Sequence, residues 1–114
     1  MLKNNYVRRG MYLFADQRPR LLKLTLAEAE EKGLPKPRSM DEVLREIVDA
    51  GIGKVFAKRD DSELKKKHVS SLRLDQWELL SKTAIRVSSG RGWLVSRDEL
   101  LREIVETALV ERGF

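Results

Sequence analysis

The chain has 114 residues, the length of one small domain, and its 23 Lys and Arg against 18 Asp and Glu give a formal net charge of +5. It has no cysteine, one histidine, no signal-peptide pattern and no apolar run near the roughly 20 residues that a membrane span needs, which argues against disulfide, zinc and membrane classes. We therefore expect one folded, cytoplasmic domain over residues 1–114 without a cofactor. Its basic charge favours a polyanionic partner.

The first predicted element is a strand over residues 11–16, MYLFAD. Its composition is apolar and aromatic, as strands favour, but the segment is apolar on both faces. Two orientations stay open at this point: either Tyr12 and Phe14 point outward, or Met11 and Leu13 do.

A helix is predicted next, because Pro19 suits a first helical turn and apolar residues follow at helical spacing at Leu22, Leu26 and Ala29. Gly33 marks its end. A second helix begins at Ser39, which forms an S-x-x-E capping box with Glu42 and precedes an apolar stripe of Val43, Leu44, Ile47 and Val48. Gly51 is the expected stop.

Residues 54–67 are charged and without a clear period, which predicts a connection. Residues 68–75, HVSSLRLD, alternate as a strand with one face inward does. A helix follows from a box-like start at Asp75 and Glu78. Its apolar face comprises Trp77, Leu80, Ala84 and Val87. Both tryptophans, Trp77 and Trp93, are expected in the core.

The last helix begins at Ser96, and its sequence repeats that of the helix at Ser39. SRDELLREIVETA and SMDEVLREIVDAG share eight of thirteen positions at an offset of 57, including both capping boxes. Gly33 and Gly90 precede the two serines by six residues each. The sequence therefore predicts two strand-helix-helix repeats, over residues 9–53 and 68–114, that complete each other within one domain.

This order resembles the ribbon-helix-helix family of Arc, MetJ and CopG repressors, and its tandem form resembles TraY-type proteins of conjugative plasmids. The resemblance covers most of the chain. It rests on VSSLRLD, a helix, a turn that bears Gly90, and SRDELLREIVETA, with a weaker echo from MYLFAD to SMDEVLREIVDAG. It implies a mostly α fold with a short two-stranded antiparallel β-ribbon, a tandem ribbon-helix-helix pseudo-dimer of order β-α-α-β-α-α. It also implies that the ribbon enters the DNA major groove.

By period-two placement, the outward side chains that would read bases are Val69, Ser71 and Arg73, with Tyr12 and Phe14 from the first strand. Arg73 is the foremost candidate, because a guanidinium can donate twice to guanine O6 and N7. Ser71 can pair with several bases, and Val69 can contact a thymine methyl group.

Phosphate contacts are expected where each capped helix begins, because its free amides and dipole favour an anion. His68 is expected beside phosphate or solvent. The capped helices are acidic, which suggests that they turn away from the DNA. The candidate phosphate-binding residues are Ser39, Met40, Ser96, Arg97, Lys65, Lys66, Lys67, Arg8 and Arg9.

The functional expectation is a sequence-specific, double-stranded DNA-binding transcription regulator that is not an enzyme, since no catalytic or metal-binding motif occurs. One alternative is an accessory protein of a plasmid transfer-origin (relaxosome) complex, and another is an antitoxin-like protein-binding module. No membrane partner and no small-molecule ligand are expected. We expect a monomeric pseudo-dimer, with cooperative binding on adjacent sites left open.

Overall fold

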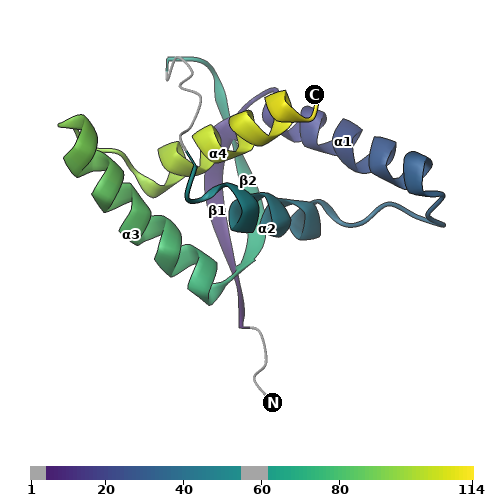
Figure 1. Ribbon diagram of the computed structural model, residues 1–114, viewed down its shortest axis with the longest axis horizontal. Helices are drawn as coiled ribbons and strands as arrows, with labels where there is room; N and C mark the ends of the chain where they lie inside the picture. The colour runs from purple at the N-terminus through teal and green to yellow at the C-terminus, as the bar shows by residue number, and fades with distance from the viewer. Residues whose placement is uncertain (1–4, 55–61) are drawn as a thin grey trace.

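The computed structural model describes residues 5–54 and 62–114, which form four helices and one two-stranded antiparallel sheet in the order β-α-α-β-α-α (Figure 1). Strand β1 spans Tyr6–Phe14 and strand β2 spans Lys65–Arg73. The helices are α1 over Gln17–Lys32, α2 over Met40–Gly51, α3 over Leu74–Arg91 and α4 over Arg97–Glu111. No described helix is long and apolar enough to cross a bilayer.

The two strands pair along their whole length, from Tyr6 opposite Arg73, through Gly10 opposite Val69, to Phe14 opposite Lys65. Both strands are longer than their sequences predict. In β1, Arg8, Arg9 and Gly10 interrupt the apolar pattern and hide the first half of the strand. In β2, the lysines at 65–67 read as a solvated connection although their backbone pairs with residues 12–14.

The fold class expected from the sequence, a tandem ribbon-helix-helix pseudo-dimer with a short ribbon, is wrong on two findings. The sheet is not short, since each strand has nine residues. The helix pairs are also not equivalent copies, because α4 buries eight residues and lies across the centre of the molecule, whereas α2 buries four (Figure 1). The chain is a mostly helical protein with four helices and a two-stranded sheet.

Ser39 and Ser96 are confirmed as the caps at which the two helices start. The Glu42 amide donates to Ser39 Oγ at 3.1 Å, and the Glu99 amide donates to Ser96 Oγ at 3.0 Å. The expected box at Asp75 is wrong, because α3 begins directly after β2, and the Arg73 amide donates to Gln76 Oε1 at 3.0 Å. Gln76, three residues after the cap, therefore accepts from the cap amide, a role that the sequence had predicted for Glu78.

The glycine that corresponds to Gly33 in the second half of the chain is Gly92, not the Gly90 that the sequence had predicted. Gly33 ends α1 in the left-handed region at φ 64°, and Gly92 ends α3 in the same way at φ 81°. Gly90 lies inside α3. Gly33 and Gly92 are 59 positions apart, so α1 and α3 correspond at that offset, and the connection to the capped helix is two residues shorter in the second half.

The core lies between the inner face of the sheet and the four helices, with α4 at its centre. Met11, Leu72 and Leu100 are fully buried. Leu22 and Leu26 are about half exposed, at 47% and 48%, so the predicted apolar face of α1 is wrong at these two positions, while Ala29 is buried as predicted. The buried face of α1 consists of Gln17, Leu21, Thr25 and Ala29.

Ion pairs tie the outer helices to the centre. Arg91 of α3 donates to both carboxylate oxygens of Glu103 at 2.7 and 2.8 Å, and Arg20 of α1 donates to both oxygens of Glu106 at 2.8 and 3.1 Å. Glu103 is 5% exposed, and Arg91 supplies the compensation that a buried carboxylate requires. The bond to Glu103 raises the pKa of Arg91, and the bond to Glu106 raises that of Arg20.

Gln76 provides a test of the sheet-to-helix connection. It is 2% exposed, accepts from the Arg73 amide, and donates to the Arg45 carbonyl oxygen at 2.9 Å. Gln76→Leu strands both backbone groups, so we expect urea unfolding to show a loss of at least about 2 kcal/mol. Leu79→Ala, at a position 46% exposed on the same helix, is the control and should change stability by less than about 0.5 kcal/mol. Equal stability of Gln76→Leu and the parent would contradict the role of this side chain.

Candidate nucleic-acid interface

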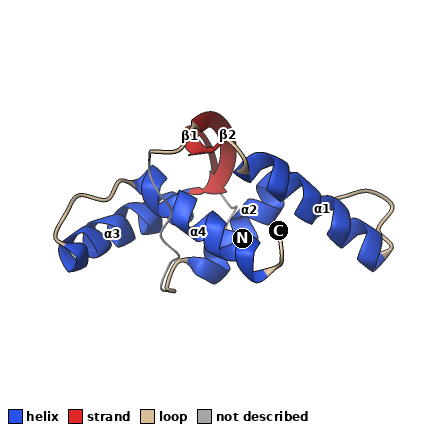
Figure 2. Ribbon diagram, turned by 90° about the horizontal axis from the view of Figure 1, so that it is seen from above, coloured by secondary structure: helices blue, strands red, loops and turns tan. Residues whose placement is uncertain are grey.

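One face of the sheet carries no helix. Figure 2 shows the strands on one side of the molecule and the four helices on the other. Successive strand residues alternate between the two faces, so Met11, Leu13 and Leu72 point into the core. The opposite face, called the outer face below, is formed by Tyr6, Arg8, Gly10 and Tyr12 of β1 and Lys67, Val69, Ser71 and Arg73 of β2.

The exposures settle the orientation of β1. Tyr12 is 50% exposed, whereas Met11 and Leu13 are buried, so Tyr12 points outward as the first of the two predicted orientations had it. Phe14 was predicted to point outward with it, and this is wrong, because Phe14 is only 3% exposed. The strand ends at Phe14, where the guanidinium of Arg102 lies 5.5 Å from its ring centroid and Lys65 Nζ lies 5.6 Å from it.

Arg8 and Ser71 face each other across the middle of the outer face, and Tyr12 faces Lys67. Gly10 stands opposite the 46%-exposed Val69. A Cβ atom at position 10 would lie 2.5 Å from Lys67 Cε, so glycine gives the lysine stem room to cross the strand. Basic, hydroxyl, aromatic and aliphatic groups therefore occur together on one uncovered surface.

Arg73 lies at the end of the outer face, and its guanidinium is engaged by two carboxylates. It donates to Asp49 Oδ1 at 2.9 Å and to Asp75 Oδ1 at 3.1 Å. These bonds, that to Asp49 first, raise the pKa of Arg73. Its Nε and Nη2 atoms both donate within the protein, in contrast to Arg8, which makes no such bond in the described part of the chain.

The strands are fastened to the capped helices at their outer edges. Arg102 Nη1 donates to the Tyr12 carbonyl oxygen at 2.8 Å, and the Tyr12 amide donates to Asp98 Oδ2 at 3.2 Å. On the other strand, Arg45 Nη1 donates to the Ser71 carbonyl oxygen at 2.7 Å. Ser70 Oγ donates to Asp41 Oδ1 at 3.1 Å. The first turns of α2 and α4 thus lie against the sheet.

The residues that make these connections were not predicted from the sequence. Arg45 and Arg102 occupy the same place in the two LREIV segments, so their identity was a usable signal. Gln17 and Gln76, 59 positions apart, make matching bonds, since Gln17 accepts from the Phe14 amide and donates to the Arg102 carbonyl oxygen, each at 3.0 Å. A buried glutamine is hard to foresee because nothing in its type indicates burial.

The predicted phosphate contacts fall into three groups. Ser39 and Ser96 have hydroxyl oxygens that accept from their own helices, with Met40 and Arg97 as the first helical residues. The guanidinium groups of Arg9 and Arg97 lie against the ring of Trp77, at 5.8 Å and 4.9 Å from its centroid. The others lie on the strands, and they are Arg8, Lys65, Lys66 and Lys67.

Two aromatic positions depart from prediction. Of the two expectations for His68, phosphate or solvent, solvent is wrong, because β2 turns it inward opposite Met11 and it is only 8% exposed. Burial, and then the charge of Arg18, lower its pKa, while Asp41 opposes them. Trp93 is 50% exposed and does not fill the core, unlike Trp77, which is 2% exposed and donates from Nε1 to the Val7 carbonyl oxygen at 2.9 Å.

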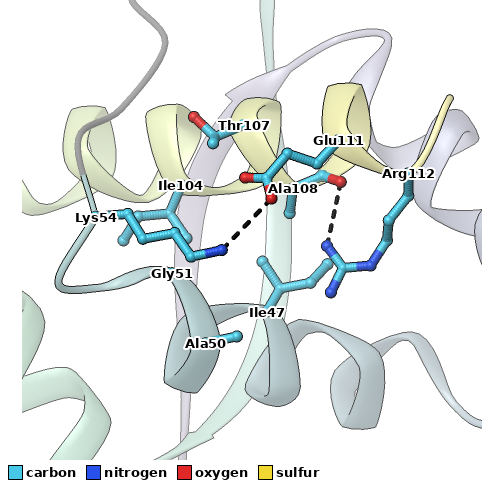
Figure 3. A pocket seen from close by; sticks show the side chains of 9 residues that line it. All are labelled: Ile47, Ala50, Gly51, Lys54, Ile104, Thr107, Ala108, Glu111 and Arg112. Carbon is cyan, nitrogen blue, oxygen red and sulfur yellow. Dashed lines mark hydrogen bonds and ion pairs between the residues drawn. The ribbon is translucent and has the colours of Figure 1, made fainter.

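A second feature is a cavity of about 170 Å³ between α2 and α4, away from the outer face (Figure 3). Ile47 and Ile104 give it apolar walls, and Lys54 donates to Glu111 at 3.4 Å, which joins its two sides. Within the described ranges, no group of three His, Asp or Glu side chains is arranged to hold a metal ion.

Comparison of the chain with protein-family models, curated proteins and solved structures found no match. Its function must therefore be argued from the surfaces described above.

The burial of His68 predicts a pH dependence of stability. Its folded pKa lies below the ordinary value of about 6.5, so the unfolded chain binds more protons below that pH, and stability falls as the pH drops from about 7.5 to 5.5. The slope is at most about 1.4 kcal/mol per pH unit. Urea unfolding at several pH values measures it, and His68→Gln should flatten it, since His68 is the only histidine. A parent protein without such a slope would contradict the burial.

Proposed function

We propose that the protein binds double-stranded DNA sequence-specifically, inserts the outer face of the β1–β2 sheet into the major groove, and acts in the cytoplasm as a transcription regulator. The observation that carries this proposal is the uncovered outer face with Arg8, Tyr12, Lys67, Val69 and Ser71. The major groove, about 12 Å wide, admits a two-stranded ribbon and presents a distinct donor and acceptor pattern for each base pair.

The outer face offers the chemistry that base reading needs. Arg8 can donate twice to guanine O6 and N7, and Ser71, directly opposite, can pair with several bases. Val69 suits a thymine methyl group. Arg8 is the better guanine reader than Arg73, because Arg73 would first have to release Asp49 and Asp75. The two strands carry different side chains, so the DNA site need not be palindromic.

The internal use of acidic residues supports the proposal. The carboxylates of α2 and α4 are largely engaged within the fold: Asp98 binds the Tyr12 amide, Asp49 binds Arg73, and Glu103 binds Arg91. Cations on the strands, such as Arg8 and Lys67, make no ion pair with any described residue. Asp49 of α2 offsets one cation of the outer face, Arg73, whereas Arg8 and Lys67 keep an unpaired positive charge, which favours attraction to phosphates.

A second candidate is the accessory role in a plasmid transfer-origin complex, in which the same face would bind DNA and another surface would bind a protein. The observation that favours it is the exposed turn between the end of α3 and the start of α4, where Trp93 is 50% exposed and Leu94 is 87% exposed. Selection of duplexes from a random pool distinguishes the two roles, because the recovered motif lies upstream of genes for a regulator and beside a transfer origin for an accessory protein.

Arg8 is the first residue to test. With a duplex recovered by selection, Arg8→Ala should remove discrimination at one base pair, a loss of about 1–3 kcal/mol relative to substituted duplexes, measured by fluorescence anisotropy. Arg86→Ala, an exposed arginine on α3, is the matched control and should keep the parental preference. An unchanged preference in Arg8→Ala would remove Arg8 from the base-reading residues.

The lysines at 65–67 test the phosphate contacts. Changing all three to glutamine should weaken binding to every duplex and flatten the plot of log K against log salt by about 0.9 for each lost phosphate contact. Lys82→Gln on α3, where the side chain is exposed, serves as the control. A parental slope in the triple variant would place the phosphates elsewhere.

A further inference from the structure

A cavity of about 190 Å³ lies where β1 turns into α1 and β2 passes beside them. Its apolar walls come from Leu13, Phe14 and Pro19. Its polar lining is entirely basic or imidazole, and comprises Arg18, Lys66, Lys67 and His68. The proposed DNA-reading face does not account for it, although Lys67 belongs to both surfaces.

His68 is the polar group buried in this lining. Its side chain is 8% exposed, and its Nε2 atom is buried without a hydrogen-bond partner among the described residues. A buried ring nitrogen without a partner costs about 1–3 kcal/mol. Nε2 has almost no accessible area, so a ligand in the cavity would accept from it once the ring turns toward the cavity, and this bond would recover that free energy.

The surrounding charges specify the ligand. Arg18, Lys66 and Lys67 line the cavity, and none of them is paired with a carboxylate in residues 5–54 and 62–114. The acidic group that acts on His68 is Asp41, which accepts from Ser70 Oγ. Cations gathered around a buried imidazole, without a carboxylate in the lining, fit a multiply charged oxyanion.

The opposite end of the sheet shows why the space exists. Arg18 follows Gln17 as Trp77 follows Gln76, and the two glutamines make matching bonds to strand and helix. At that end, the indole of Trp77 is buried and donates to the Val7 carbonyl oxygen. At the end of the sheet near His68, Arg18 occupies the position that corresponds to Trp77, and the cavity lies where the indole ring would be.

We infer that this cavity is an anion site that binds a phosphate-type oxyanion, with Arg18 and Lys66 supplying the positive charge and His68 Nε2 donating a hydrogen bond. The ligand chemistry is shared by two sources, a backbone phosphate of bound DNA and a free phosphate or phosphorylated small molecule. The first source rests on the proposed function; the second does not.

The anion site is tested by titrating the protein with inorganic phosphate at fixed pH and ionic strength, following the His68 imidazole and backbone amides by NMR. We expect saturable shifts at His68 and at residues 15–18, and a rise in the pKa of His68, because a nearby anion favours the imidazolium. Arg18→Gln and Lys66→Gln, both at exposed positions, should each weaken phosphate binding at least tenfold, whereas Lys82→Gln should bind as the parent does. The absence of a saturable shift at His68, or parental affinity in both variants, would overturn the inference.

The source of the anion is decided with the selected duplex. If a DNA phosphate occupies the site, duplex binding shifts the His68 resonances, and Arg18→Gln lowers the salt slope by about 0.9. If Arg18→Gln loses phosphate affinity but keeps the parental salt slope, the ligand is a free oxyanion. If phosphate binds and no duplex does, the anion site stands and the proposed DNA-binding function fails.

Discussion

The backbone bonds at the outer edges of β1 and β2 are the constraint on which the rest of the structure depends. A two-stranded sheet has two open edges, and each edge must find partners or be hydrated. Arg102 and Asp98 engage Tyr12 on one edge, and Arg45 engages Ser71 on the other. Because the edges are held by side chains that reach around from the helices, the outer face stays uncovered.

The same arrangement accounts for the distribution of charge. Arginines at the helix junctions are bound by a carboxylate or a backbone oxygen, as Arg91 is by Glu103 and Arg45 is by Ser71. Arg8 and Lys67 on the outer face have no such partner within the described chain, whereas Arg73 at its end is held by Asp49 and Asp75. A protein with nearly balanced total charge therefore presents one strongly basic face, which a net charge of +5 does not by itself reveal.

The differences between the halves matter as much as their likeness. Corresponding positions carry Trp77 in one half and Arg18 in the other, and this exchange turns a filled core position into the cavity beside His68. Corresponding helices also differ, since α4 buries eight residues and α2 buries four. The residues that match between the halves hold the strands to the helices in the same way at both ends of the sheet. The residues that differ give the two ends different chemical groups.

The sequence by itself determined the order of the elements, the helix starts at Ser39 and Ser96 and the outward orientation of Val69 and Ser71, because capping and period-two alternation are local effects. The extent of β1, the inward side chains of Phe14 and His68, the exposure of Trp93 and the pairing of Arg73 with Asp49 came only with the tertiary structure. Each of these depends on a partner distant in the chain: strand pairing supplied hydrogen bonds to residues of low strand propensity, and the packing of α4 decided which aromatic rings it covered.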